Sequence, residues 1–404
     1  MAGRMEMSAR CVVVVGGGAV GLASAFRILE RAPETRLTLV EKEAAVGQHQ
    51  TGNNSGVMHC GLAYRPGSQK AKLAVKGIRQ MAEFCRSHSI PHDVCGKLVV
   101  ATREEHRPRL QDLFERGTQN GLHGLEILDL PRMRAIEPHV AGVAGLRVPE
   151  EGIVDYPAVC QALRGEIEAR GGTVVVSAGV TGLRRNAQEW RVETRAGDFA
   201  ADVVVTCAGL QADRVARLAG VETEVQIVPF RGDYYKLRPE REFLVRNLIY
   251  PVADPKFPFL GLHFTRMIRG GIEAGPNAVL ALKREGYSRI AFNLRDAAEA
   301  LAFPGLWRFV GQHARMCAAE LRRAFSESLF CKALQQLVPE VQEGDLEPAG
   351  SGVRAQAMRP DGRLVEDFEI VVRYGGVHVL NAPSPAATAC LAIGEEVAAL
   401  ALAQ

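Results

Sequence analysis

Short apolar runs and helical spacing alternate at the start of the chain. Residues 11–15 read CVVVV and residues 37–40 read LTLV, and continuous β-branched runs of this kind are typical of buried parallel strands. Between them, apolar positions at helical spacing predict a helix over residues 19–31, which ends before Pro33. This order predicts a βαβ unit that opens a doubly wound sheet.

The same kinds of pattern return after long interruptions. Helical spacing predicts helices over residues 69–87 and 156–170, and a polar helix that ends near Asn120. Gly171 and Gly172 follow the second of these helices, as expected of a helix C-terminus. Further strands are predicted at 96–102, 173–177 and 202–209. We expect the strand at 173–177 to return to the first sheet.

The second half of the chain has a different pattern. Residues 221–282 contain longer, alternating and aromatic segments such as IVPFRGDYYKL, which predict antiparallel sheet. Helical segments occupy much of 295–338, and a short strand, VHVL, precedes a final helix. We therefore predict a mixed fold, α/β plus α+β, in which a Rossmann-like domain is interrupted by an antiparallel-sheet domain. The first domain is predicted to comprise residues 8–80, 150–220 and 350–404, and the second residues 81–149 and 221–349.

Composition narrows the class of protein. With 404 residues, 47% of them hydrophobic and 24% charged, the chain resembles a soluble globular protein of two domains. A net charge of +3 without a polybasic block argues against a nucleic-acid partner. No apolar run approaches the roughly 20 residues that span a bilayer, and MAGRMEMSAR lacks the apolar core of a secretory signal. Nine scattered cysteines without a CxxC pair predict neither a metal site nor a disulfide framework, and favour the cytoplasm.

A glycine motif follows the first predicted strand. Gly16, Gly18 and Gly21 have GxGxxG spacing, and Glu41 ends the next strand. Such glycines let the backbone approach a pyrophosphate at a helix N-terminus, while the acid can accept from ribose hydroxyls. The motif predicts a dinucleotide site, either for a nicotinamide or for a flavin. The alternative is a glycine-rich turn in an unrelated α/β sheet.

Two later segments favour a flavin. A second glycine loop, QTGNNSGVMHCG at 50–61, follows the shortened βαβ unit and leads into His59 and Cys60. NAPSPAAT at 381–388 predicts a helix start, with Ser384 as N-cap and Pro385 in the first position. A helix N-terminus aimed at the flavin pyrimidine edge would stabilise negative charge there. An ordinary capped terminal helix is the alternative for this segment.

At this point a family resemblance becomes specific. GGGAVGLASA, HQTGNNSGVMHCGLAY, PFRGDYYKL, LIYPVADPKFPFLGLHFTRM, SGVRAQ and NAPSPAATA together resemble the L-2-hydroxyglutarate dehydrogenases (oxidases), a branch of the DAO superfamily of FAD enzymes. The resemblance implies FAD as cofactor and a two-electron oxidation of a dicarboxylate, L-2-hydroxyglutarate, to 2-oxoglutarate. It also implies a membrane quinone as electron acceptor, with oxygen as the alternative, and peripheral contact with the cytoplasmic face of the inner membrane. Arg269 departs from the acidic turn residue expected there, in a predicted hairpin tip.

The expected cofactor contacts extend beyond the first glycine loop. The second loop would carry the chain along the cofactor towards the flavin ring, and a late strand ends in a glycine turn. We expect FAD contacts from Gly16, Gly18, Ala19, Gly21, Glu41, Lys42, Thr51, Asn54, Ser55, Gly56, Val180, Gly209, Pro383, Ser384 and Ala386.

The proposed chemistry requires a base and groups that bind carboxylates. A neutral imidazole can accept the hydroxyl proton, and the candidates are His59, then His263, with His378 as a weaker substrate contact. Two carboxylates require arginine or tyrosine partners. Arg354 is the first choice, because SGVRAQ resembles a DAO segment that places an arginine beside the flavin. Weaker candidates are Arg231, Tyr234, Tyr250 and Arg266, each equally compatible with a surface ion pair or a core tyrosine.

Several alternatives stay open at this point. A sibling enzyme on the same scaffold would oxidise an amino acid, an amine or glycerol 3-phosphate, and a non-catalytic flavin-binding protein is a third class. Cys60 could hold the flavin covalently or act in redox chemistry, although buried free cysteines commonly serve as small hydrophobic residues. The charged stretch at 102–109 is typical of a solvated helix start, with a membrane or partner face as the alternative.

Overall fold

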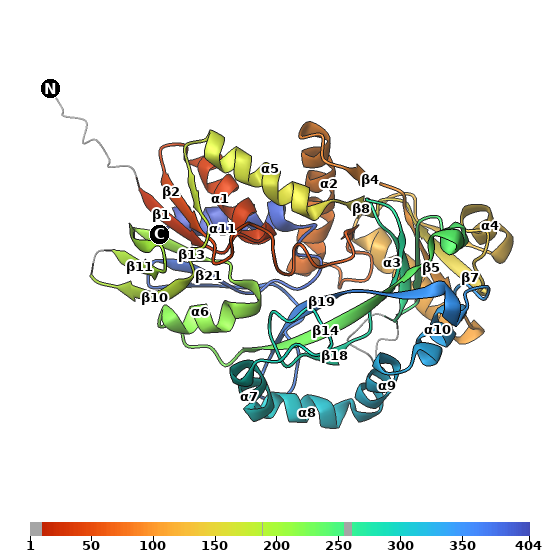
Figure 1. Ribbon diagram of the computed structural model, residues 1–404. Helices are drawn as coiled ribbons and strands as arrows, with labels where there is room; N and C mark the ends of the chain where they lie inside the picture. The colour runs from red at the N-terminus through yellow and green to blue at the C-terminus, as the bar shows by residue number, and fades with distance from the viewer. Residues whose placement is uncertain (1–9, 188, 254–260) are drawn as a thin grey trace.

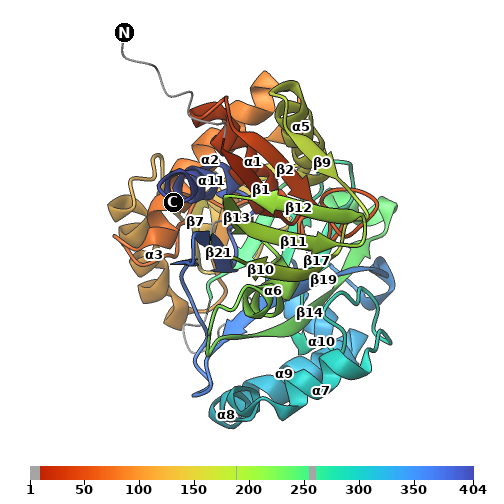
Figure 2. The same cartoon turned by 90° about the vertical axis from the view of Figure 1, so that its left-hand side faces the viewer.

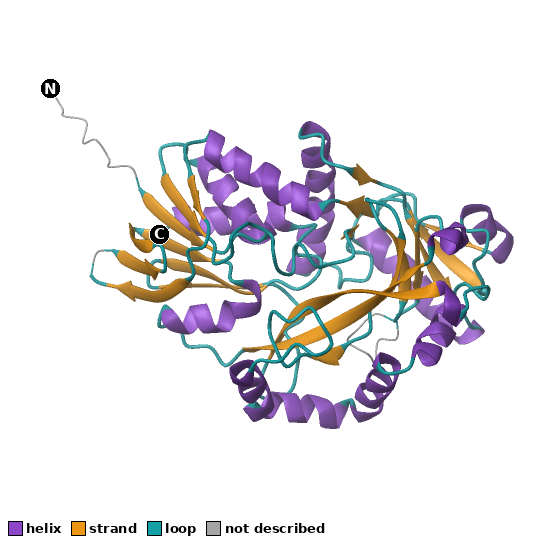
Figure 3. Ribbon diagram, in the orientation of Figure 1, coloured by secondary structure: helices purple, strands orange, loops and turns teal. Residues whose placement is uncertain are grey.

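The computed structural model describes residues 10–187, 189–253 and 261–404. Within them the chain forms two main sheets (Figures 1 and 3). One is mostly parallel and covered by helices, and the other is larger and mainly antiparallel. DPKFPFL at 254–260, part of the predicted antiparallel region, lies outside the described residues, as does most of MAGRMEMSAR.

The predicted N-terminal βαβ unit is confirmed. β1 (Cys11–Val15) pairs in parallel with β2 (Arg36–Val40), and α1 (Ala19–Arg31) connects the two strands. β1 also pairs in parallel with β13 (Val203–Thr206), so β1 lies inside the sheet. The complete order is β20 (Glu369–Arg373), β21 (Gly376–Asn381), β13, β1, β2 and β9 (Thr173–Val175). The return of the 173–177 segment to this sheet is confirmed by the parallel pairing of β9 with β2.

Both faces of β1 are buried, which explains its continuous apolar run. Val12 and Val14 belong to the core beneath α1, α2 (Gln69–Ser87), α5 (Tyr156–Ala169) and α11 (Cys390–Leu402). Val13 and Val15 belong to a second core on the opposite face. That face is covered by α6 (Ala212–Leu218) and by a small sheet of β10 (Val180–Arg185), β11 (Trp190–Thr194) and β12 (Gly197–Ala201) (Figure 2).

The large sheet contains the predicted antiparallel region. Its longest pair, β14 (Gln226–Leu237) and β19 (Leu346–Met358), runs across the middle of the molecule, with Phe230 opposite Arg354 (Figure 1). The other strands are β18 (Val279–Leu280), β17 (Ile272–Gly275), β16 (His263–Arg266), β15 (Leu248–Pro251), β5 (Lys97–Ala101), β7 (Ala144–Val148) and β6 (Glu126–Leu128). β19 extends this sheet past position 350, where the last segment of the predicted first domain begins. The proposed division into domains stays a prediction.

The remaining elements connect the two sheets or cover the large one. A second small sheet comprises β3 (Val57–Met58), β8 (Gly152–Val154) and β4 (His92–Asp93). The other α-helices are α3 (Arg107–Gln119), α4 (Leu130–Ile136), α7 (Leu294–Ala302), α8 (Pro304–Gln312), α9 (Ala314–Ala324) and α10 (Glu327–Gln335). Short 3-10 turns occupy η1 (Glu104–His106), η2 (Gly209–Gln211), η3 (Pro239–Leu244) and η4 (Glu343–Asp345). Within the described residues, no helix has the length and apolar character that a membrane crossing requires.

The predicted helix start at Ser384 is wrong. α11 begins at Cys390, and before it the Ala386 amide donates to the Pro383 carbonyl and the Ala389 amide to the Pro385 carbonyl, in turns. Tertiary contacts hold this segment, because Thr388 Oγ1 lies 2.7 Å from the Tyr156 hydroxyl and accepts from the His59 amide at 3.1 Å. The segment therefore packs beside the second glycine loop instead of forming a capped helix.

Candidate active site

A cavity of about 1100 Å³ lies between the mostly parallel sheet and the large sheet. Its lining comes from the loops after β1, β2 and β13, from the second glycine loop, and from β14, β16 and β19. Ligand pockets for small molecules typically measure about 300–1,000 Å³. The cavity is therefore large enough for a dinucleotide together with a small acid.

The first glycine loop lies at the wall of this cavity. Gly16 has φ +108°, and a Cβ there would lie 2.4 Å from the Cys207 carbonyl oxygen, so only glycine fits. Gly18 precedes α1 and offers no side-chain cap, while the Ala19 amide donates to Thr51 Oγ1 at 3.1 Å. Gly21 does not line the cavity. Its role is to let α1 pack on the Gly16 carbonyl, where a Cβ would not fit. The loop therefore presents backbone and a helix N-terminus to a ligand.

Glu41 ends β2 at the cavity wall, as predicted, but its carboxylate already has partners. Oε2 accepts from the Gly17 amide at 2.6 Å and Oε1 from the Glu43 amide at 2.9 Å. These two bonds orient the carboxylate and leave other lone pairs, since a carboxylate has about four acceptor sites. Glu41 can therefore both brace the glycine loop and accept from a ribose hydroxyl.

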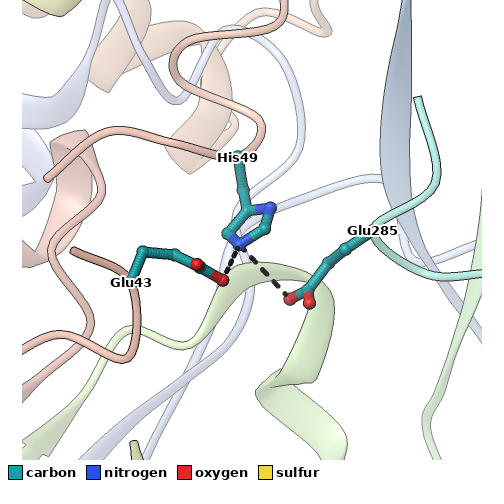
Figure 4. Close-up of side chains that lie close together, drawn as sticks. All are labelled: Glu43, His49 and Glu285. Atoms are coloured by element: carbon teal, nitrogen blue, oxygen red, sulfur yellow. Dashed lines mark hydrogen bonds and ion pairs between the residues drawn. The ribbon is translucent and has the colours of Figure 1, made fainter. Parts of the chain in front are cut away.

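A charged cluster stands at the rim of the cavity beside Lys42. Glu43, His49 and Glu285 point towards one another, with His49 Nε2 lying 2.9 Å from Glu43 Oε1 and 3.8 Å from Glu285 Oε1 (Figure 4). These three side chains have the donor types of a metal site. However, Lys42 Nζ lies 2.7 Å from His49 Nε2 and 2.9 Å from Glu285 Oε2. The ammonium thus already neutralises the carboxylates, and the cluster joins the two sides of the cavity as an ion-pair network.

Most of the predicted cofactor residues line the cavity. Gly56 is an exception, because it occupies a turn with φ +69° close to the Val154 carbonyl. The residues that line it are Gly16, Gly18, Ala19, Glu41, Lys42, Thr51, Asn54, Ser55, Val180, Gly209, Pro383, Ser384 and Ala386.

His59 follows β3, lines the cavity and lies next to a buried charge pair. Its Nδ1 is 3.4 Å from Glu151 Oε2, and that oxygen is 2.7 Å from Lys97 Nζ. Glu151 and Lys97 are both buried. Burial opposes ionisation of Glu151, but the Lys97 charge and the hydrogen bond to His59 hold the pKa of this carboxyl well below its usual range. An ionised Glu151 favours a proton on His59 Nδ1, which leaves Nε2 free to accept a proton.

His263 lies on β16 and also lines the cavity. Its ring stacks on Tyr250 at a centroid distance of 3.8 Å, and its Nδ1 lies 2.9 Å from the Gly261 carbonyl oxygen, to which it can donate. Burial lowers the pKa of His263 to about 3. This imidazole is therefore neutral near pH 7, with Nε2 available as an acceptor.

Arg354, Tyr234 and Tyr250 bring polar groups from the large sheet to the same cavity. Arg354 lies on β19 and is partly buried, as is Tyr234 on the paired strand β14. Burial raises the pKa of Tyr234 to about 12, so its hydroxyl keeps its proton and can donate. A guanidinium and a neutral phenol together suit a carboxylate ligand.

Three other candidates face away from the cavity, because side chains alternate along a strand. Gly232 and Tyr234 of β14 line the cavity, so Arg231 points to the other face and binds Asp233, with Nε to Oδ1 at 2.7 Å. His378 of β21 is fully buried, with Nδ1 3.1 Å from Thr206 Oγ1. Arg266 of β16 pairs with Asp93. Arg231, Arg266 and His378 are therefore not among the residues that line the cavity, and their role as ligand contacts stays a prediction.

Arg269, the departure noted in the sequence, lies in the hairpin after β16. Its Nη2 binds Asp155 Oδ2 at 2.7 Å, and Asp155 caps α5 through the Ala158 amide. This arginine therefore ties the large sheet to a helix of the first sheet, away from the cavity lining.

Sequence reasoning missed several residues around the site. Glu151 lies next to His59 and pairs with Lys97. The one sequence feature that could have indicated these two residues is that each is a charged residue at the start of a short apolar strand or just before it. Tyr64 lines the cavity and donates its hydroxyl to the Ser384 carbonyl at 3.2 Å. Lys70 also lines it, and burial lowers its pKa to about 8. Their roles depend on tertiary neighbours that no local pattern reveals.

A glycine loop at the carboxyl end of a parallel strand, facing a large antiparallel sheet that carries imidazole and guanidinium groups, is the arrangement of a nucleotide-dependent oxidoreductase. Residues 11–400 match the family described as DAO, FAD dependent oxidoreductase, and the chain belongs to this family. The match confirms the DAO assignment and FAD as the cofactor. The chain is thus an FAD-dependent enzyme.

Curated relatives match over nearly the whole chain. An L-2-hydroxyglutarate dehydrogenase of Indibacter alkaliphilus is 47% identical, with 97% of this chain and 98% of the relative covered. That of Escherichia coli strain K12 is 41% identical, with 95% and 91% covered. The mitochondrial L-2-hydroxyglutarate dehydrogenase of Bos taurus is 40% identical, with 98% and 89% covered. These relatives agree with the family that the sequence motifs indicated.

Solved structures agree on the fold. The FAD-bound L-α-glycerophosphate oxidase of Mycoplasma pneumoniae superposes with a TM-score of 0.80 at 22% identity, covering 98% of this chain and 95% of that one. The glycine oxidase of Geobacillus kaustophilus gives 0.74 at 18% identity, covering 98% and 95%. The predicted Rossmann-like domain joined to an antiparallel sheet is confirmed.

The residues present fit FAD. The bare backbone of the Gly16 loop and the start of α1 suit the pyrophosphate, and Glu41 suits a ribose. The second glycine loop lines the same cavity from Thr51 to Ser55 and leads to His59.

Proposed function

We propose that this chain oxidises L-2-hydroxyglutarate to 2-oxoglutarate. The observation that carries the proposal is that His59, His263 and Arg354 line one cavity with the glycine loop. The names of the curated relatives support the choice of substrate. When bound, FAD supplies the two-electron acceptor for hydride from the substrate carbon.

Different side chains of the cavity bind the substrate and accept its proton. Arg354 and Tyr234 bind a substrate carboxylate through charge-assisted hydrogen bonds. His59 Nε2 accepts the hydroxyl proton, and Glu151 holds its Nδ1–H and stabilises the imidazolium that results. His263 stays neutral, and its Nε2 accepts a hydrogen bond from the substrate because its Nδ1–H donates to the Gly261 carbonyl. The stacked Tyr250 ring fixes the orientation of this imidazole.

We also propose that electrons pass to a quinone dissolved in a membrane, so that the enzyme works in the cytoplasm as a peripheral protein of the inner membrane. The motif resemblance supports this acceptor. Oxygen is the competing acceptor, and comparing the two as reoxidants of the reduced enzyme tests this part of the proposal.

Anaerobic flavin bleaching tests the substrate. L-2-hydroxyglutarate, its D isomer, glycine, sarcosine and glycerol 3-phosphate are added separately to the yellow enzyme, and the absorbance of the oxidised flavin is followed. We expect rapid bleaching by L-2-hydroxyglutarate alone. Bleaching by glycerol 3-phosphate or an amine instead would assign the enzyme to a sibling activity.

The proton acceptor is tested in the same assay. His59→Gln retains a polar side chain but removes the base, so the bleaching rate should fall by about 10² to 10⁴. Arg231→Gln is a useful comparison, because Arg231 faces away from the cavity. An unchanged rate in the His59 variant would transfer the role of base to another group.

A further inference from the structure

Large apolar side chains are exposed along one continuous segment, from the loop before α7 to α10. Eight of the fourteen exposed large apolar side chains of the described residues lie between positions 290 and 329. Ile290 is 92% exposed, Phe325 81% and Leu294 75%. The others are Phe292, Leu301, Trp307, Leu321 and Leu329. Isolated exposed apolar residues are ordinary, but a concentration of them marks an interaction surface.

These side chains point away from the protein. α8 and α9 bury Phe309 and Met316 in a core that also holds Phe230 of β14. Because each helix packs its inner face on that core, the exposed residues of α8 and α9 lie on the outer face. Both ribbon views show α7, α8 and α9 along one edge of the molecule (Figures 1 and 2).

Positive charge surrounds the apolar residues. Between positions 288 and 332, six Lys or Arg residues are exposed but only one acid, Glu327. The six are Arg289, Arg295, Arg308, Arg315, Arg322 and Lys332. Arg295 and Arg289 pair with Glu299 and Asp233, and the other four cations against Glu327 keep the face positive, which disfavours self-association. Apolar residues amid exposed arginines instead match the headgroup boundary of a membrane with anionic lipids.

The loop within this face adjoins the cavity rim. Glu285 and Arg295 both line the cavity, and Ile290, Phe292 and Leu294 lie between them in the sequence. A surface in contact with these three residues would therefore lie beside the rim.

We propose that the outer face of residues 288–332 docks on an anionic lipid bilayer. Ile290, Phe292 and Leu294 enter the headgroup boundary, and the arginines of α8 and α9 contact lipid phosphates. This inference gives the proposed peripheral membrane contact a surface and rests on that part of the proposed function. It is independent of the substrate.

Co-sedimentation of the FAD-loaded, full-length enzyme with vesicles tests the proposal. Vesicles of phosphatidylcholine alone are compared with vesicles that contain phosphatidylglycerol, and binding is expected to require the anionic lipid. Arg315→Gln with Arg322→Gln should weaken binding roughly fivefold per arginine. Replacing Ile290, Phe292 and Leu294 by serine should weaken it by about tenfold per side chain.

Matched substitutions elsewhere control for general surface effects. Phe243→Ser and Tyr374→Ser change side chains of 57% and 58% exposure outside the segment, and Arg36→Gln with Arg373→Gln removes two exposed arginines near the first sheet. Vesicle binding should be unchanged in these controls. FAD content and melting temperature verify that every variant is folded.

Three results would overturn the proposal. The first is that the parent enzyme and the variants in residues 288–332 bind vesicles equally well, and the second is that binding does not depend on anionic lipid. The third is that the enzyme associates with itself in the absence of vesicles and that the serine variant does not. The last would make this face an interface between copies of the chain. Flavin bleaching by L-2-hydroxyglutarate is measured on the same samples, so a failed substrate assignment is distinguished from a failed docking surface.

Discussion

Glu151 couples a buried ion pair to the imidazole that faces the substrate cavity. Its carboxylate lies between Lys97 Nζ at 2.7 Å and His59 Nδ1 at 3.4 Å. A charged carboxylate in this position accepts from Nδ1–H and so fixes the imidazole tautomer, with Nε2 as the acceptor. Its contribution to proton transfer is therefore made through His59, as a positioning residue.

Glu151→Gln should separate this role from simple packing. The amide keeps the shape but removes the negative charge, so the imidazolium of His59 loses stabilisation. We expect a lower maximal bleaching rate with an unchanged substrate concentration for half-maximal rate, because Glu151 acts through His59 and does not contact the substrate. Stopped-flow bleaching over a series of substrate concentrations measures both quantities. An unchanged maximal rate in a folded, FAD-loaded variant would reduce Glu151 to a structural residue.

Two of the predicted ligand contacts, Arg231 and His378, do not line the cavity, and both cases have one cause. Arg231 and His378 lie on correctly predicted strands, but a strand has two faces and the sequence does not say which faces the ligand. His59 and Arg354 were predicted from the motifs that surround them, and both line the cavity. Glu151 was missed because its partners come from β5 and from the loop after β3, far away along the chain.

At the scale of elements, most strands and helices were predictable. Continuous valine runs such as β1 identify strands buried on both faces, and the spacing of residues 69–87 predicted α2 with its observed ends. The predicted helix start at Ser384 failed because Thr388 is held by Tyr156 and His59. Local capping rules cannot anticipate such a contact.

Close packing of α11 on α1 gives a test at this scale. A Cβ on Gly394 would lie 2.7 Å from the backbone of Ala23, so Gly394→Ala forces the helices apart and should destabilise the protein by roughly 1–3 kcal/mol. Gly165 in α5 has no atom within 4 Å of its would-be Cβ. Gly165→Ala should therefore be stabilising, by about 0.5–1 kcal/mol.

Urea denaturation of the FAD-loaded enzyme measures both glycine variants. If both substitutions changed the free energy of unfolding by the same amount and with the same sign, helix propensity would determine the change, and not the contact between α1 and α11.

At the scale of the whole molecule, the cavity joins the two sheets. Its lining draws on the Gly16 loop from one side and on Tyr234 and Arg354 from the other, while the Lys42–Glu285 contact of 2.9 Å links the two sides at the rim. A ligand that fills this cavity contributes contacts to both sheets. Stability should therefore depend on the cofactor.

Removal of FAD should lower the melting temperature, and added FAD should restore it in proportion to the logarithm of its concentration. Free FAD at 1,000 times its dissociation constant contributes about 4 kcal/mol. Differential scanning calorimetry over a series of FAD concentrations measures the effect, with NAD as the control ligand. A melting temperature independent of FAD would contradict the linkage.

The position of β1 has a consequence for synthesis on the ribosome. Among the described strands β1 is made before all others, yet its neighbour β13 comes from residues 203–206 and α11, which belongs to the helix layer over β1, from residues 390–402. At about 5–20 residues per second, the completed βαβ unit waits roughly 20 to 70 seconds for α11. Until then its apolar surfaces are open to chaperones and to other nascent chains, so the earliest of the described strands is among the last to be enclosed.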